Sequence, residues 1–120
     1  MPTRRATRYA ERGQLECGFR VLQGHQDGLT TGWRHGLATL AVDHITFVAT
    51  IGGVRFLKRQ PIHLTVEGVN ADTPRQPSGR EIISASPVTR VIQLRTPTAV
   101  LEWAILADQV TWAVHQVNPE

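Results

Sequence analysis

Apolar and polar residues alternate with a period of two along most of the chain, which is typical of half-buried β-strands. The clearest case is Leu15, Cys17, Phe19 and Val21, which alternate with polar or small residues. The pattern predicts seven strands, at residues 14–21, 33–42, 45–51, 54–58, 62–69, 88–95 and 99–105. Polar loops with glycine or proline separate them at 23–32 and 70–80, Gly52-Gly53 suits a hairpin turn, and 81–87 is ambiguous.

The period changes near the C-terminus. Val110, Ala113, Val114 and Val117 stand at i, i+3, i+4 and i+7, which places them on one face of an amphipathic helix. We expect Val114, in the middle of this face, to be buried. Asp108 is positioned to cap the N-terminus of the helix, and Pro119 follows its end.

Strands that are joined in sequence must close on themselves or cover their edges. The predicted fold class is therefore mostly β: a seven-stranded antiparallel barrel or sandwich with one C-terminal α-helix. The 120 residues suit one domain, which we expect to span residues 14–118 after a basic, mobile arm at 1–13. The chain contains no apolar run long enough to cross a membrane, and its start lacks the apolar region of a signal peptide.

The formal net charge of +3 is concentrated in the arm. Arg4, Arg5, Arg8 and Arg12 face one acidic residue there, Glu11, whereas basic and acidic residues balance in the remainder. A nucleic-acid-binding domain usually spreads its basic residues over the fold, so this class is disfavoured. A basic arm of this kind favours weak contact with an anionic lipid surface.

The count and order of elements resemble the pleckstrin-homology-like barrel, a fold that hosts lipid, peptide and protein binders. Five features also resemble an uncharacterised actinobacterial family, domain of unknown function 2550: LECGFR (15–20), GWRHG (32–36), DHITF (43–47), IHLTV (62–66) and the final helix with Trp112. This resemblance implies an N-terminal membrane helix and a basic stretch before a small cytosolic domain. The present chain departs by beginning at the basic stretch, so we expect either that the membrane helix has been removed or that this relative lacks it. No catalytic residues are implied.

The residues that carry chemistry do not form a known motif. Five histidines lack the close spacing of zinc ligands, so we expect no metal and no other cofactor. Cys17 alternates with apolar residues and is expected in the core as a structural thiol. His35 would be its candidate base if the first two strands pair, but no third group that orients the base is evident. The chain is therefore not expected to be an enzyme.

These observations favour a non-catalytic binding or scaffolding module at the cytoplasmic face of the membrane, with a protein or peptide partner. The candidate groove lies between the strand at 62–69 and the final helix, where a peptide would add to a sheet edge. Its residues are Ile62, Leu64, Val66, Trp112 and His115.

The alternative is a module that binds anionic lipid or an acyl chain directly at the barrel mouth, through Trp33 and Arg34. Phosphoinositide-binding members of the pleckstrin-homology class carry basic residues around the first hairpin loop. Residues 23–32 contain no lysine or arginine, which argues against that specificity. An enzyme ranks third, and a nucleic-acid binder fourth.

Overall fold

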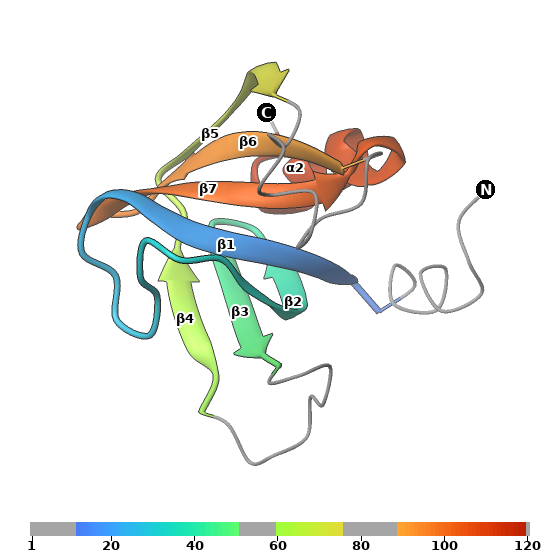
Figure 1. The fold of residues 1–120 in the computed structure, drawn as a ribbon. Helices are drawn as coiled ribbons and strands as arrows, with labels where there is room; N and C mark the ends of the chain where they lie inside the picture. The colour runs from blue at the N-terminus through green and yellow to red at the C-terminus, as the bar shows by residue number, and fades with distance from the viewer. Residues whose placement is uncertain (1–11, 51–59, 76–88, 120) are drawn as a thin grey trace.

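The computed structural model describes residues 12–50, 60–75 and 89–119. These residues form seven strands and a short helical C-terminus (Figure 1). The strands are β1 (Gln14–Gly24), β2 (Arg34–Ala41), β3 (His44–Ala49), β4 (Ile62–Thr65), β5 (Gly68–Arg75), β6 (Thr89–Arg95) and β7 (Ala99–Leu106). A 3-10 turn, η2 (Ala107–Gln109), leads into α2 (Val110–Val117).

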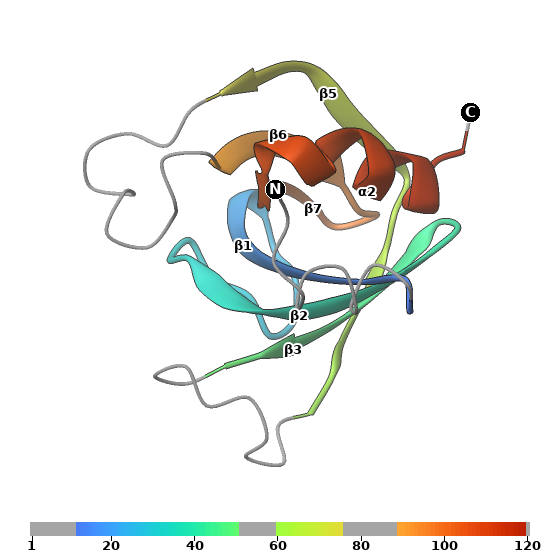
Figure 2. The ribbon, with the colours of Figure 1, turned by 90° about the vertical axis from the view of Figure 1, so that its right-hand side faces the viewer.

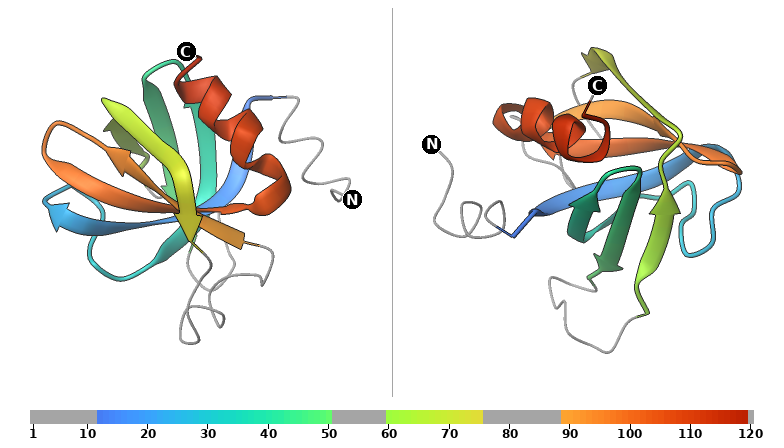
Figure 3. Two further views of the ribbon diagram at one scale, coloured as in Figure 1. Left: turned by 90° about the horizontal axis from the view of Figure 1, so that it is seen from above. Right: turned by 180° about the vertical axis from the view of Figure 1, so that it is seen from behind.

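All seven described strands belong to one antiparallel sheet, in the order β4-β3-β2-β1-β7-β6-β5. The predicted mostly β class with a C-terminal helix is confirmed. Of the two predicted arrangements, the closed barrel is wrong, because β4 and β5 lie at the two edges of the sheet and do not pair with each other. The sheet is instead strongly curled, and α2 flanks the curled strands (Figure 3).

The inner face of the curled sheet forms the core. Phe19 on β1 stacks on Trp103 of β7, its cross-strand neighbour, with ring centroids 5.6 Å apart. Phe47 on β3 meets the same phenylalanine edge to face at 4.9 Å, although β2 lies between their strands in the sheet. All three aromatic side chains are fully buried. The curl therefore brings the inner faces of non-neighbouring strands into direct contact, as packing of an apolar core requires.

The two edges of the sheet are joined by a two-residue corner, Val66 and Glu67, between β4 and β5. Figure 2 shows the chain passing here from one side of the sheet to the other. The Val66 N–H donates to the Asp43 carbonyl in the β2–β3 turn, and the Glu67 N–H donates to the Arg95 carbonyl at the end of β6. The Asp43 N–H in turn donates to the Val117 carbonyl of α2. One turn thus connects the corner and the helix.

The helix docks as its periodicity predicts, with two differences in detail. Ala113 and Val117 are fully buried, whereas Val114, expected at the centre of the buried face, is only half-buried. The cap assigned to Asp108 is wrong. This residue lies in η2, Gln109 occupies the N-cap position, and no side chain caps the helix. The helix therefore begins directly after the 3-10 turn, without a capping side chain.

Several strand boundaries also differ from the prediction. The strand expected at 62–69 divides into β4 and the start of β5 at the corner. The loop expected at 70–80 is wrong for residues 70–75, which belong to β5. The number of described strands is seven, as expected, but the set of strands differs. The described set includes β5, which was not predicted as a separate strand, and does not include the strand expected at 54–58. That strand, the Gly52-Gly53 turn and the ambiguous segment at 81–87 lie outside the described residues.

Substituting Val117 with aspartate is expected to destabilise the domain by about 3 kcal/mol or more, because an unpaired carboxylate would enter the core. Urea denaturation of Val117→Asp measures this loss. Thr111→Asp, at an exposed position of the same helix, is the matched control and is expected to change stability by less than about 0.5 kcal/mol. Equal stabilities of the two variants would show that α2 is not docked on the sheet.

Candidate functional site

A groove opens where β5 separates from β6. The two strands pair in regular register only over the first part of β5, which ends at Asn70 opposite Gln93. The next paired residue of β5 is Arg75, opposite Val91, so β5 advances five residues while β6 advances two. A surplus of this kind makes a strand bend outward. Figure 2 shows β5 arching away from β6 on the side where α2 lies.

The groove has a volume of about 700 Å³, within the range of ligand-binding clefts. Ala107 and Pro119 belong to its described lining, and the remaining apolar residues are Ala71 on β5 and Val110 and Val114 on α2. All three side chains are half-buried and pack against the core. Apolar side chains therefore remain accessible to a ligand at this position without disturbance of the fold.

The ionisable side chains that line the described part of the groove are all basic. Among its described lining residues, the groups able to carry charge are Arg90 and His115, and no carboxylate is present. The Arg90 guanidinium donates to the Thr89 carbonyl at 3.0 Å, which uses one of its five N–H groups. Arg90 lies on β6, and His115 lies on the exposed side of α2. The groove therefore combines an apolar lining with basic side chains, which suits an anionic ligand.

The five residues expected to form a groove do not line one opening, because four of them belong to the core cluster or pack against it. His115 lines the groove described above. Leu64 and Val66 are buried in the core. Ile62 packs over Gly28, where an added Cβ would lie 2.7 Å from its side chain, and the half-buried Trp112 packs against the core cluster. A binding role for these five residues stays a prediction.

Sequence reasoning missed Ala71, Arg90, Val110 and Val114 as groove residues. The segment that contains Ala71 was expected to be a loop, so the strand that forms one wall of the groove was not anticipated. Val110 and Val114 were assigned to the buried face of the helix. The available signal was the width of that face, since a helix with four apolar positions can cover the core and still present one edge to a ligand.

Trp33 and Arg34 were expected at a barrel mouth; Arg34 begins β2, and Trp33 directly precedes it. The indole ring of Trp33 stacks near the His35 ring at 6.4 Å, and the Arg20 guanidinium lies 5.2 Å from its centroid. Arg20 is itself held by the buried carboxylate of Glu102, with Nε and Oε1 2.7 Å apart. Trp33 therefore takes part in a cluster on the outer face of the sheet. Lipid binding by Trp33 and Arg34 stays a prediction.

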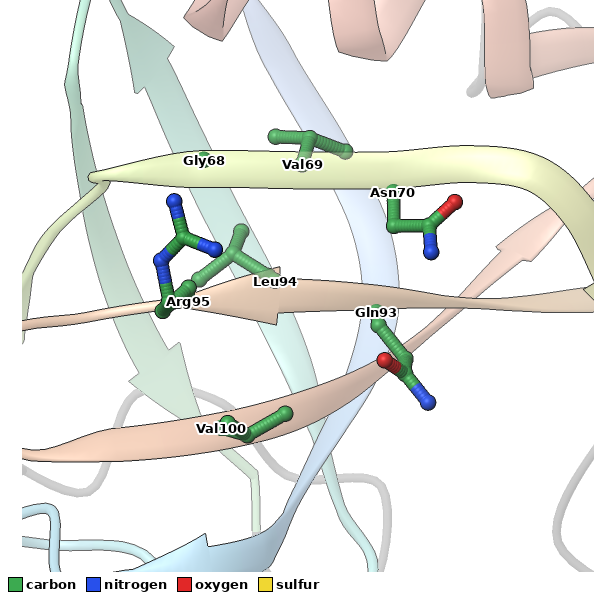
Figure 4. Close-up of a pocket in the computed structure, with 7 residues that line it drawn as sticks. All are labelled: Gly68, Val69, Asn70, Gln93, Leu94, Arg95 and Val100. Atoms are coloured by element: carbon green, nitrogen blue, oxygen red, sulfur yellow. The ribbon is translucent and has the colours of Figure 1, made fainter.

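A smaller hollow of about 200 Å³ lies over the paired part of β5 and β6. Figure 4 shows the Arg95 side chain extending from β6 toward Gly68 on β5. A Cβ built on Gly68 would lie 2.8 Å from a guanidinium nitrogen of Arg95, so the glycine leaves room for this cation. The hollow is below the size of ordinary ligand sites, and the groove beside α2 is the stronger candidate.

Cys17 and His35 lie on opposite faces of the sheet. The cross-strand partner of Cys17 is Gly36, and that of the outward Gly18 is His35. Cys17 is buried, as predicted, and burial raises the pKa of its thiol to about 12. Burial lowers the pKa of His35. The two side chains therefore cannot act together as nucleophile and base, which must be within hydrogen-bond reach.

Cys17 is expected to resist alkylation in the native protein. With its pKa raised to about 12, the thiol stays protonated at pH 8, and the buried sulfur is closed to the reagent. Iodoacetamide labelling followed by mass spectrometry should proceed no faster than global unfolding, and should become fast in denaturant. Rapid labelling without denaturant would mean that the thiol is open and ionised.

The described histidines include no metal cluster. Across residues 12–50, 60–75 and 89–119, no group of three or more His, Cys, Asp and Glu side chains is placed to hold a metal ion. His25 pairs with Asp27, with Nε2 and Oδ1 2.9 Å apart, and His44 contacts His63. This last contact joins residues far apart in the sequence.

The arginine arm lies mostly outside the described residues. Arg4, Arg5 and Arg8 are not described, and Arg12 is exposed just before β1. In the described part of the chain, no helix has the length and hydrophobicity needed to cross a membrane. Comparison of the chain with protein-family models, with curated proteins and with solved structures finds no match.

Proposed function

We propose that the domain is a non-catalytic module that binds a peptide or protein segment in the groove between β5 and α2. The observation that carries the proposal is the accessible apolar lining of Ala71, Val110 and Val114 beneath a strand that has left its partner. Catalysis would need reactive groups that converge. Cys17 and His35, the pair that sequence singled out, face opposite sides of the sheet.

The position of β5 supports binding of an extended segment. β5 pairs with β6 on one side, and no described strand pairs with its other side. An edge strand offers unpaired backbone groups to an added strand, while neighbouring pockets select its side chains. The basic groups Arg90 and His115 favour a ligand with acidic residues or a free carboxylate.

The proposal extends to the fold family and to location. Seven antiparallel strands followed by a C-terminal helix support kinship with pleckstrin-homology-like domains, although this order alone does not select a ligand. The arginine-rich arm, with a net charge of +3 in residues 1–12, supports placement of the domain beside the anionic cytoplasmic face of a membrane. The arm would position the domain, and the groove would select the partner.

The groove is tested with acidic peptides selected from a displayed random library against the full chain. Their affinity, measured by fluorescence anisotropy, is expected to fall at least about tenfold in His115→Glu, because a carboxylate would replace a donor in the groove and repel the ligand. His115 is exposed, so this substitution should leave the circular dichroism spectrum unchanged.

Thr98→Glu is the matched control. It adds the same charge at an exposed position of the β6–β7 turn, at the end of that hairpin away from Arg90. Affinity should be retained in this variant. If no peptide is enriched, or if His115→Glu binds as tightly as the parent chain, the groove is not a peptide site.

The arm is tested with vesicles that contain phosphatidylglycerol. The four arginines should gain roughly 1 kcal/mol each near an anionic surface, so the chain should co-sediment weakly in low salt. Binding should fade as salt rises, because the Debye length falls from about 30 Å at 0.01 M to about 8 Å at 0.15 M. Removal of residues 1–12 should abolish binding and leave the fold intact.

Replacement of the same four arginines by lysine is the control for charge, and it should preserve most of the vesicle binding. Replacement by glutamine should abolish it. If the chain without residues 1–12 still binds vesicles, the folded domain itself binds lipid, which would support the direct lipid-binding alternative.

A further inference from the structure

Two histidines from neighbouring strands meet on the outer face of the sheet. Nε2 of His44 on β3 lies 3.3 Å from Nδ1 of His63 on β4, with ring centroids 5.5 Å apart. The register pairs His44 with Thr65 and Thr46 with His63, so the histidines are diagonal neighbours on one face. Diagonal neighbours are within reach when their side chains are long. The residues between them in each strand, Ile45 and Leu64, point into the core.

The separation of the two nitrogens matches a shared metal ion. Zinc binds imidazole nitrogen at ~2.05 Å and prefers tetrahedral geometry. Two nitrogens at that distance and at the tetrahedral angle lie roughly 3.3 Å apart, whereas the right angle of an octahedral site would bring them to roughly 2.9 Å. The observed 3.3 Å therefore fits the tetrahedral angle. In the structure the two ring nitrogens share a hydrogen bond at this separation, so a bound ion would take the place of the shared proton.

We propose that His44 and His63 form a two-histidine binding site for a zinc ion on the β3–β4 face. His63 is exposed and His44 is partly exposed, so the ion enters directly from solvent. No third His, Cys, Asp or Glu joins the pair among the described residues. The ion keeps two positions for water or for an external ligand, one more than the open zinc sites that have three protein ligands. The site differs from the sequence expectation of no metal because 19 residues separate the ligands, which hides them from spacing rules.

The test is calorimetric titration of the full chain with zinc chloride, together with thermal melts. Wild-type protein is expected to bind zinc and to melt at a higher temperature in its presence, because an ion that binds only the folded state stabilises it. His44→Ala and His63→Ala should each lower zinc affinity at least about tenfold. Mutation of residues that merely hold metal ligands in place already lowers affinity by about that factor, and these variants remove a ligand itself. One zinc per two chains would mean that a second copy fills the open positions with its own pair, and would support the site.

His25→Ala is the matched control, because His25 is an exposed histidine paired with Asp27 and lies outside the β3–β4 face. It should bind zinc as the wild type does. All three variants change side chains on the surface, and their circular dichroism spectra and melts without zinc verify that they fold. The proposal is overturned if the wild type takes up no zinc at hundreds of micromolar. It is also overturned if both alanine variants keep full affinity, or if the loss appears in His25→Ala instead.

Discussion

The backbone of Asp43 holds together the end of the molecule where the sheet changes direction. Its carbonyl accepts the N–H of Val66 at the β4–β5 corner, and its N–H donates to the carbonyl of Val117 at the end of α2. Asp43 adopts a positive φ of 58°, which aspartate tolerates better than most residues. In most tight turns such backbone groups are hydrogen-bonded to water. Here the N–H and the carbonyl of Asp43 instead connect the β2–β3 hairpin to α2 and to the β4–β5 corner.

This junction determines where the sheet is constrained and where it is free. The chain can leave one sheet edge at β4 and begin the other at β5 only if the sheet curls until the edges approach each other, and the corner fixes that approach with two residues. From the corner, β5 follows β6 as far as Asn70 and then separates from it. The groove forms in this freer part, with α2 as its other wall. The corner therefore attaches β5 at its start, and the register surplus beyond Asn70 opens the groove.

The sequence predicted the elements whose core contacts follow the period of the strand or helix. β1 and β3 alternate apolar and polar residues because each has one face in the core, β6 and β7 are largely apolar because most of their residues are buried, and α2 shows its helical period because one face packs on the sheet. β5 reads GVNADTPR, with Asn, Asp and Pro, all of which are depleted in strands. Its strand conformation comes from pairing with β6 and from the corner before it. These tertiary constraints override local propensity and are invisible to a pattern search.

The same reasoning explains why the candidate sites were harder to predict than the fold. Cys17 was placed in the core correctly because its environment depends on its own strand. The contact between His44 and His63 depends instead on the register of two strands, in which Thr46 lies opposite His63. A shift of β4 by one residue would turn His63 toward the core and expose Leu64, which is fully buried. The burial of Leu64 therefore fixes the register, and with it the position of His63. The contact between the two surface histidines therefore depends on the burial of Leu64 in the core, because this burial fixes the strand register that places His63 beside His44.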